Sequence, residues 1–409
     1  MVGDRSHPTV RYSSHAVFYE GQIIITHGYF YNHDISKPAW QSDAWAYTAR
    51  SGMWRQVHRG EKDGAPSARY SGTAVLHKGG LYMYGGDDGG HKRSMNNYVF
   101  KAWNSELWRL DLGSYAWRSV TPAGGPSTLP PKRALHSAVV LGDAMYVYGG
   151  IDHSDTWSFD FATRSWRAIE KGSASKERRY HPGVRHSHSA AADPRGGGFF
   201  VFGGSAHGAP LKPLAFDDLW RFDLARASWT LLEAAPSSGL PPQPWGLAPP
   251  PRSHSSLVAA PNSSLLLYGG ALCTPGCRCY GDAWVYHIGG EGRAPGWSRV
   301  NTSSSPIHRY RQSLVRDPAD GSLYLFGGES YKPYMYHNAV DRLWVEGLSA
   351  GSLAAPSTGP RLGATPAAGS MVPVAAAGVG IGLLAFWLIR KTCCAPREKV
   401  RFYNLAPGV

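Results

Sequence analysis

Residues 81–86 read LYMYGG, a short apolar run that ends in a pair of glycines. Runs of the same kind occupy residues 23–28, 145–150, 199–204, 265–270 and 323–328, although the first ends in His27-Gly28. Apolar runs this short, without polar alternation, are typical of strands that are covered on both faces. The paired glycines allow a backbone turn that a Cβ atom would hinder. The sequence therefore predicts six copies of one strand-and-turn unit.

Two further residue types recur in each unit. An arginine that opens a neighbouring strand lies 17 to 19 residues before the end of each glycine turn, at Arg11, Arg69, Arg133, Arg185, Arg252 and Arg309. A third strand is marked by Trp45, Trp108, Trp157, Trp220, Trp284 and Trp344. Another tryptophan follows nine residues later at Trp54, Trp117, Trp166 and Trp229, and 13 residues later at Trp297. Four strands in each of six units predict an all-β fold, a six-bladed β-propeller.

The composition agrees with this fold class. The 409 residues include 49 Gly, 15 Trp and 22 Tyr, which speaks against a helical bundle or a disordered chain. Five cysteines are too few for a disulfide scaffold. The net charge is +13, but the repeats contain no dense run of Lys and Arg. Nucleic-acid binding therefore has little support from the sequence.

The arginine strand, the double glycine, the acidic-x-Trp strand and the final tryptophan together resemble the Kelch repeat. The resemblance covers roughly residues 11–348 and implies a Kelch-repeat propeller over residues 1–348, with units that start near residues 11, 69, 133, 185, 252 and 309. It departs from the pattern at His27 and in the sixth unit, which lacks its last tryptophan. An array of six units followed by a membrane segment is most similar to attractin-like Kelch ectodomains.

The C-terminal part predicts a membrane anchor. Residues 349–370 form an Ala/Pro/Ser/Gly-rich stalk, and residues 371–389 run for 19 residues without a charge, which is long enough to cross a hydrocarbon core of ~30 Å as a transmembrane helix. Arg390 and Lys391 begin a basic tail, residues 390–409, and the positive-inside rule places that tail in the cytosol. We therefore expect a single-pass membrane protein whose propeller is luminal or extracellular. Cys393 and Cys394 are candidates for palmitoylation next to the lipid bilayer.

The opposite topology stays open, because residues 1–10 contain no signal peptide. A tail-anchored protein would keep its propeller in the cytosol. Two N-glycosylation sequons, at Asn262 and Asn301, favour the luminal topology. Only ten residues precede Arg11, and no tryptophan occurs near residue 353, where a closing strand would carry one. We therefore expect the natural protein to begin upstream of Met1.

No motif predicts catalysis, a cofactor or a metal site. Asp87, Asp88 and His91 lack the first Glu of the iron-dependent Kelch specifier proteins, and six units are one fewer than in galactose-oxidase-like propellers. No Ser-His-Asp triad stands out among the 17 His residues. Cys273, Cys277 and Cys279 are candidates for one disulfide in a loop, since a metal site would lack a fourth ligand.

The six arginines have natural acidic partners. An acid lies two residues before the third-strand tryptophan in five units, at Asp43, Glu106, Asp155, Asp218 and Asp282, and Asp341 lies nearby in the sixth. Because a buried arginine without a partner is costly, we expect buried pairs that fix the blades. An anion-binding mouth is the alternative for this arginine ring.

The loops after the glycine turns are the predicted ligand-binding rim. Four of them are long and mix aromatic with polar residues, whereas the third, at residues 151–154, is short and would leave a notch. Exposed aromatic and basic side chains suit protein hot spots or sugar stacking. The rim candidates are Tyr29, Tyr31, Trp40, His91, Arg93, Tyr98, Trp103, Tyr331, Tyr334 and Tyr336.

These features favour a membrane-anchored module that binds a protein or a glycan through its propeller, and not an enzyme. Two alternatives remain open. The chain would be the C-terminal part of a larger secretory-pathway enzyme, for example a processing protease with the propeller as accessory domain, or a cytosolic tail-anchored scaffold.

Overall fold

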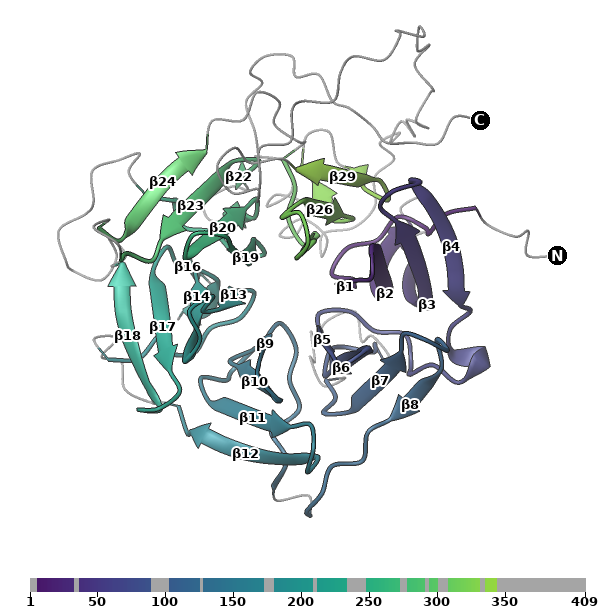
Figure 1. Ribbon diagram of the computed structural model, residues 1–409, viewed down its shortest axis with the longest axis horizontal. Helices are drawn as coiled ribbons and strands as arrows, with labels where there is room; N and C mark the ends of the chain where they lie inside the picture. Colours follow the sequence, from purple (N-terminus) through teal and green to yellow (C-terminus); the bar gives the residue numbers. More distant parts are fainter. Residues whose placement is uncertain are drawn as a thin grey trace, which may run out of the picture.

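The computed structural model describes residues 6–32, 37–89, 103–125, 128–172, 180–208, 212–233, 248–272, 278–290, 294–300, 308–331 and 335–343. Six antiparallel sheets are arranged around a central axis, with the first strand of each sheet innermost (Figure 1). This confirms the predicted all-β, six-bladed propeller.

The sheets, here called blades 1 to 6, follow one another in the sequence, and every strand pairs antiparallel with its neighbour. Blade 1 contains β1 (His15–Tyr19), β2 (Gln22–Asn32), β3 (Lys37–Thr48) and β4 (Met53–His58), followed by the 3-10 helix η1 (Glu61–Asp63). Blade 2 contains β5 (Thr73–His77), β6 (Gly80–Tyr84), β7 (Leu107–Asp111) and β8 (Trp117–Ser119). Blade 3 contains β9 (Ser137–Leu141), β10 (Ala144–Tyr148), β11 (Thr156–Asp160) and β12 (Ser165–Glu170).

Blade 4 contains β13 (Ser189–Ala192), β14 (Gly198–Phe202), β17 (Leu219–Asp223) and β18 (Ser228–Glu233). Blade 5 contains β19 (Ser256–Ala260), β20 (Ser264–Tyr268), β23 (Ala283–His287) and β24 (Gly296–Val300). Blade 6 has three described strands, β25 (Ser313–Arg316), β26 (Leu323–Phe326) and β29 (Val340–Leu343). Three small hairpins stand beyond the blades: β15 (Ser205–Gly208) with β16 (Lys212–Ala215), β21 (Ala271–Leu272) with β22 (Arg278–Cys279), and β27 (Glu329–Ser330) with β28 (Met335–Tyr336).

The innermost strands form a closed ring around the axis. Each of β1, β5, β9, β13, β19 and β25 contacts the next, and β25 returns to contact β1. The six arginines lie a few residues before these strands and not within them, which corrects the expectation that they open the strands. The arginines and the loops after the glycine turns therefore lie on one side of the propeller. We call this side the loop face, and the other side the opposite face.

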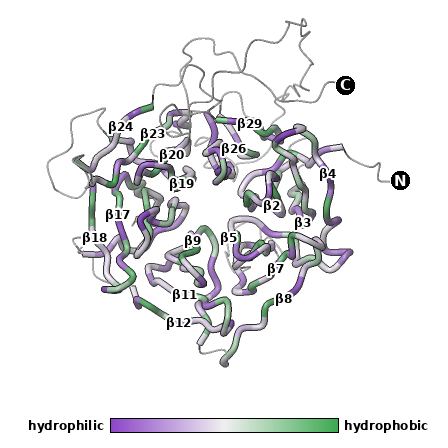
Figure 2. Tube along the Cα trace, in the orientation of Figure 1, coloured by the Kyte–Doolittle hydropathy of each residue, from purple (hydrophilic) through white to green (hydrophobic). Residues whose placement is uncertain are grey.

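Buried apolar strands fill the space between blades. The second strands are the apolar runs of the sequence, and β14 and β20 are buried at every residue. Apolar stretches accordingly follow the strands within the ring (Figure 2). The apolar clusters span blade borders, since one joins Ile24 of blade 1 to Leu81 of blade 2 and another joins Ile25 of blade 1 to Phe326 of blade 6. Interblade burial is the main stabilisation of this architecture.

The fourth-strand tryptophans reach across to the preceding blade. Ring centroids are 4.9 Å apart for Trp166 and Tyr84, 4.6 Å for Trp229 and Tyr148, 5.3 Å for Trp297 and Phe202, and 5.4 Å for Trp54 and Phe326. In each pair the partner is the aromatic residue just before the glycine turn. Blade 1 has Thr26 at that place, and His27 takes over the contact at 5.6 Å from Trp117. This contact explains why a histidine replaces the first glycine of that unit.

Residues 349–409, with the predicted stalk, transmembrane helix, tail, Cys393 and Cys394, lie outside the described residues. Across the described ranges, no helix is long and apolar enough to cross a bilayer.

Candidate binding face

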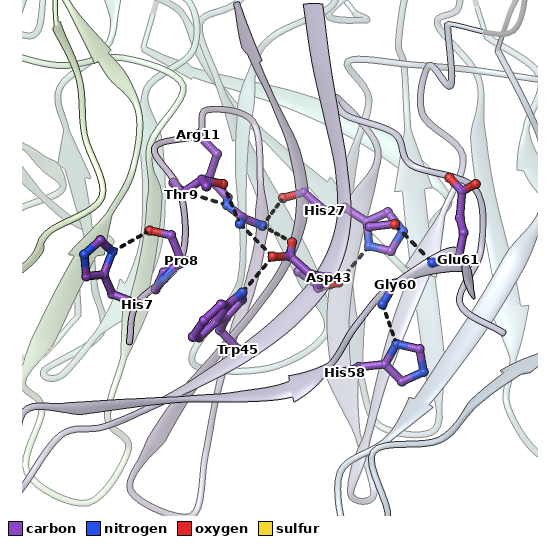
Figure 3. A network of polar contacts seen from close by, with 12 residues as sticks. His7, Pro8, Thr9, Arg11, His27, Asp43, Trp45, His58, Gly60 and Glu61 are labelled. Atoms are coloured by element: carbon purple, nitrogen blue, oxygen red, sulfur yellow. Dashed lines mark hydrogen bonds and ion pairs between the residues drawn. The ribbon is translucent and has the colours of Figure 1, made fainter. Parts of the chain in front are cut away.

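Blade 1 shows the contacts that each arginine makes on the loop face (Figure 3). The Arg11 guanidinium donates to both carboxylate oxygens of Asp43, at 2.7 and 3.2 Å, and to the carbonyl oxygen of His27 at 3.1 Å. The Trp45 indole donates to the same carboxylate at 2.7 Å. The carboxylate of the acidic-x-Trp motif thus accepts hydrogen bonds from both the arginine and the tryptophan. Through its bonds to His27 and Asp43, the arginine links the glycine turn to the third strand.

A buried arginine paired with a carboxylate recurs in each of the other five blades. The shortest Arg–carboxylate distances are 2.7 Å for Arg69–Glu106, 3.0 Å for Arg133–Asp155, 2.7 Å for Arg185–Asp218, 2.6 Å for Arg252–Asp282 and 2.7 Å for Arg309–Asp341. No arginine of the six has more than 3% of its side chain exposed. Each guanidinium is enclosed in its pair, so these six residues offer no open anion-binding mouth. The geometry favours the structural role that the spacing of the acids predicted.

The pKa values of the partner acids follow from these contacts. Burial opposes ionisation of Asp43, Asp155 and Asp282, but the paired arginine and the indole donor outweigh it, and the pKa of each carboxyl lies below its usual value. Burial alone would lower the pKa of Arg185, but the Asp218 carboxylate has the larger effect and raises it. The Asp43, Asp155 and Asp282 carboxylates are therefore ionised at neutral pH.

The glycine turns join each blade to the next. The N–H of the second glycine donates to the carbonyl oxygen of the following ring arginine, and the distances lie between 2.9 and 3.0 Å for Gly28–Arg69, Gly86–Arg133, Gly150–Arg185, Gly204–Arg252, Gly270–Arg309 and Gly328–Arg11. The last of these bonds closes the circle. A Cβ atom on Gly203 would lie 2.6 Å from the Arg252 carbonyl oxygen, which only glycine avoids. The arginines and glycines together hold all six blade ends in fixed positions.

A second ring surrounds the central channel. The second residue after each ring arginine has a left-handed backbone, at Ser13, Ser71, Leu135, Ser187, His254 and Arg311. Backbone N–H groups donate around the axis from Ser13 to Arg311, Arg311 to His254, His254 to Ser187, Ser187 to Leu135 and Leu135 to Ser71. These residues and their neighbours line a cavity of about 130 Å³. Most of the lining residues are polar, with serine and histidine side chains and one guanidinium.

Arg311 is the charged group of this cavity. Its guanidinium donates to Glu329 at 2.9 Å and lies over the rings of Tyr12, at 5.0 Å, and Tyr310, at 5.6 Å. Burial opposes its charge, but Glu329 outweighs burial and raises the pKa of Arg311, so it stays cationic. Arg311 is not among the site residues predicted from the sequence. The one sequence feature that marks it is its position, two residues after Arg309, the ring arginine of blade 6.

The predicted rim residues divide into three groups. Tyr29 and Tyr331 are buried, contrary to the expected exposure, because aromatic side chains of neighbouring segments pack against them. Tyr29 packs edge-to-face against Tyr12 and Trp40 and at a tilt against Tyr70, with ring centroids 5.0 to 5.3 Å apart. Tyr31, Trp40, Trp103 and Tyr336 are half-buried. His91, Arg93, Tyr98 and Tyr334 lie outside the described residues.

The other site candidates have separate positions. Cys279 is buried in β22, whereas Cys273 and Cys277 lie outside the described residues. Asn262 is exposed in the turn between β19 and β20, on the opposite face, and Asn301 lies outside the described residues. In the part of the chain that the structure describes, no three His, Cys, Asp or Glu side chains are grouped as metal ligands would be.

Comparison with known proteins agrees with this architecture. Residues 23–239, just over half of the chain, match the Attractin/LZTR1 beta-propeller family. The chain belongs to this family. The match starts in β2 of blade 1 and ends just beyond β18 of blade 4. It includes three of the six ring arginines, Arg69, Arg133 and Arg185, that the Attractin/LZTR1-type propeller of this chain uses to fix its blades.

Curated relatives share the Kelch-type propeller. Kelch domain-containing protein 3 of Bos taurus is 26% identical over 340 residues, which cover 78% of each chain. Host cell factor 2 of Homo sapiens is 27% identical over 58% of this chain and 25% of its own length. A sulfolyase of Thlaspi arvense, named N-(sulfonatooxy)prop-2-enimidothioate sulfolyase, is 28% identical over 44% of this chain.

A solved structure of YjhT is similar in fold. It superposes with a TM-score of 0.58 at 15% identity and covers 85% of this chain and 98% of its own. This likeness supports the Attractin/LZTR1-type propeller as a fold and carries no activity with it.

Proposed function

We propose that this propeller is a protein-binding module that uses its loop face. One observation carries the proposal: a rigid network fixes all six blade ends, while the loops that leave them differ from blade to blade. Blade 3 has a tight turn between β10 and β11, whereas blades 4, 5 and 6 carry the added hairpins described above. Variable loops on a fixed scaffold are the usual arrangement of a recognition surface. A glycan ligand is the second candidate, favoured by the half-buried Trp40 and Tyr336.

A steric block tests which face binds. A flexible insertion of about 20 residues after Asp152, an exposed loop-face turn, is expected to abolish capture of proteins by proximity labelling in cells. The same insertion after Arg50, an exposed turn between β3 and β4 on the opposite face, is the matched control and should leave the labelled set unchanged. Equal labelling by both variants and the wild type would contradict a protein-binding loop face.

We also propose that residues 371–389 anchor the protein in a membrane as a single-pass segment, with the propeller luminal or extracellular and residues 390–409 in the cytosol. The uncharged stretch and the basic residues after it support this topology. A glycan on Asn262 would project from the opposite face and leave the loop face open for a partner.

Glycosidase treatment tests the topology. The wild-type protein from a secretory-competent host should lose mass on treatment with an N-glycosidase, and the double variant Asn262→Gln, Asn301→Gln should not. A wild-type protein whose mass does not change would instead support the cytosolic tail-anchored scaffold.

A further inference from the structure

Two of the three large apolar side chains that are exposed in the described residues lie in one loop. Tyr180 has 72% of its surface exposed and Val184 has 39%, four residues apart in the segment between β12 and β13. The third, Met53, is 63% exposed and is the first residue of β4, at the opposite face. Exposed aromatic residues that lie close to another apolar side chain mark interaction surfaces more often than isolated ones do.

The backbone under these two side chains is held firmly. His181 is buried and bonds to Glu170 at 3.0 Å through Nε2, while its Nδ1 accepts the Gly183 N–H at 2.8 Å. The Tyr148 hydroxyl donates to the Gly183 carbonyl at 2.7 Å. The ring arginine Arg185 donates to the Pro182 carbonyl at 2.6 and 3.1 Å. An aromatic side chain on such a fixed backbone loses little entropy on binding, which is the property of an interface anchor.

The surroundings leave this anchor accessible. The neighbouring loop of blade 3 is the short turn between Tyr148 and Thr156, in which Ile151 is buried. Two exposed lysines border that turn. The Lys132 carbonyl accepts from His153 at 3.2 Å, and Lys171 directly follows Glu170 at the end of β12.

The local charge is positive. Lys132 and Lys171 are both exposed. Of the nearby described acids, Glu170 bonds to His181, and Asp155 is paired with Arg133. Asp152 is the exposed acid of the turn. An apolar anchor among basic side chains is complementary to a segment with an apolar residue between acidic ones.

We propose that Tyr180, Val184, Lys132 and Lys171 form a docking patch at the border of blades 3 and 4, and that its occupant is an acidic segment of a partner protein. The docking-patch proposal rests on the proposed protein-binding function. It adds where the partner binds and which chemistry the partner's segment has.

The test uses the full chain in detergent and a phage-displayed library of random 12-residue peptides. We expect the selected peptides to be enriched in Asp and Glu around an apolar residue. Tyr180→Ala should weaken a selected peptide by about 30-fold, as a hot-spot side chain does, and Lys132→Glu should also weaken it. Met53→Ala, which removes an equally exposed apolar side chain from the opposite face, should leave the affinity unchanged. Because Tyr180 is exposed, its variant should keep the thermal unfolding midpoint of the wild type.

The outcomes separate the patch from the general function. If the insertion after Asp152 abolishes peptide binding but Tyr180→Ala does not, the docking-patch proposal is wrong, while the proposal of a protein-binding loop face stands. Peptides of neutral or basic composition would overturn the acidic partner. Vesicles that contain phosphatidylserine are the second probe, and binding to them that requires Tyr180 would assign the patch to a lipid surface instead. If no peptide binds in a way that depends on the loop face, both proposals fail.

Discussion

Replacing Arg185 with alanine is expected to lower the free energy of unfolding by about 3–5 kcal/mol, because it leaves a buried carboxylate without its cation. Asp218 has only 6% of its side chain exposed, and it would keep just the Trp220 indole as a donor. The carbonyl oxygens of Gly203 and Pro182 would also lose the hydrogen bonds that the Arg185 guanidinium now donates to them. Urea unfolding of the wild type and the variant measures the difference.

The same substitution at Arg69 supplies the comparison. Its partner, Glu106, has 53% of its side chain exposed, so water can solvate that carboxylate once the arginine is gone. We therefore expect a clearly smaller loss for Arg69→Ala than for Arg185→Ala. Arg226→Ala, at an exposed surface pair on the opposite face, is the control and should change stability by less than about 0.5 kcal/mol. Equal losses at Arg185 and Arg226 would show that the ring pairs do not stabilise the blades.

The sequence predicted these pairs because they depend on spacing within one unit. Arginine, glycine turn and acidic-x-Trp strand recur together, and a propeller blade brings them to the same end. Even Asp341, which lies three residues before Trp344 and not two, pairs with Arg309 at 2.7 Å. Repetition in register is what made this inference possible.

The loop face was harder to predict because its contacts join loops of different blades. Tyr29 lies in a polar-aromatic loop that reads as exposed, yet Tyr12 and Tyr70 from two other segments cover it. Tyr180 is exposed for the converse reason, since the adjacent turn of blade 3 is too short to cover it. Neither outcome follows from composition. Both depend on contacts between segments that are far apart in the sequence.

A girdle of side-chain hydrogen bonds also links the innermost strands, and it contains several buried histidines. His136 Nε2 lies 3.0 Å from the Thr73 hydroxyl, and His188 Nε2 lies 2.9 Å from the Ser137 hydroxyl. At the equivalent position of blade 6, Gln312 donates to the Ser256 hydroxyl at 3.2 Å. The girdle therefore requires a neutral polar side chain at this position and not specifically histidine.

Burial lowers the pKa of each of these histidines, and the nearby arginines lower it further. The pKa falls to about 3 for His15 and well below the usual value for His136 and His188. The buried His27 and His337 are shifted in the same direction. These side chains stay neutral in the folded protein but take up a proton in the unfolded chain below pH ~6.5.

Acidification from pH 6.5 to 5 is therefore expected to destabilise the propeller by several kcal/mol. The unfolded state binds more protons than the folded state throughout this window, so stability rises with pH and is lost as pH falls. Each histidine whose folded pKa lies well below 5 contributes a loss of about 1.5–2 kcal/mol over this interval. Asp217 acts in the opposite direction, because burial and Asp218 raise its pKa to about 7, and it offsets about one histidine. The paired carboxylates, whose pKa values are lowered, add their own loss only at more acidic pH.

The double variant His136→Gln, His188→Gln separates the histidines from every other titrating group. Because Gln312 already fills the equivalent place in blade 6, glutamine should preserve the hydrogen bonds to Thr73 and Ser137. Urea unfolding at pH 6.5 and at pH 5 should then show a loss that is smaller by about 3 kcal/mol than in the wild type, since two groups no longer take up protons on unfolding. An identical pH dependence in the two proteins would mean that the histidines of the girdle are hydrated enough to be protonated in the folded state, and that the polar ring around the channel is open to water.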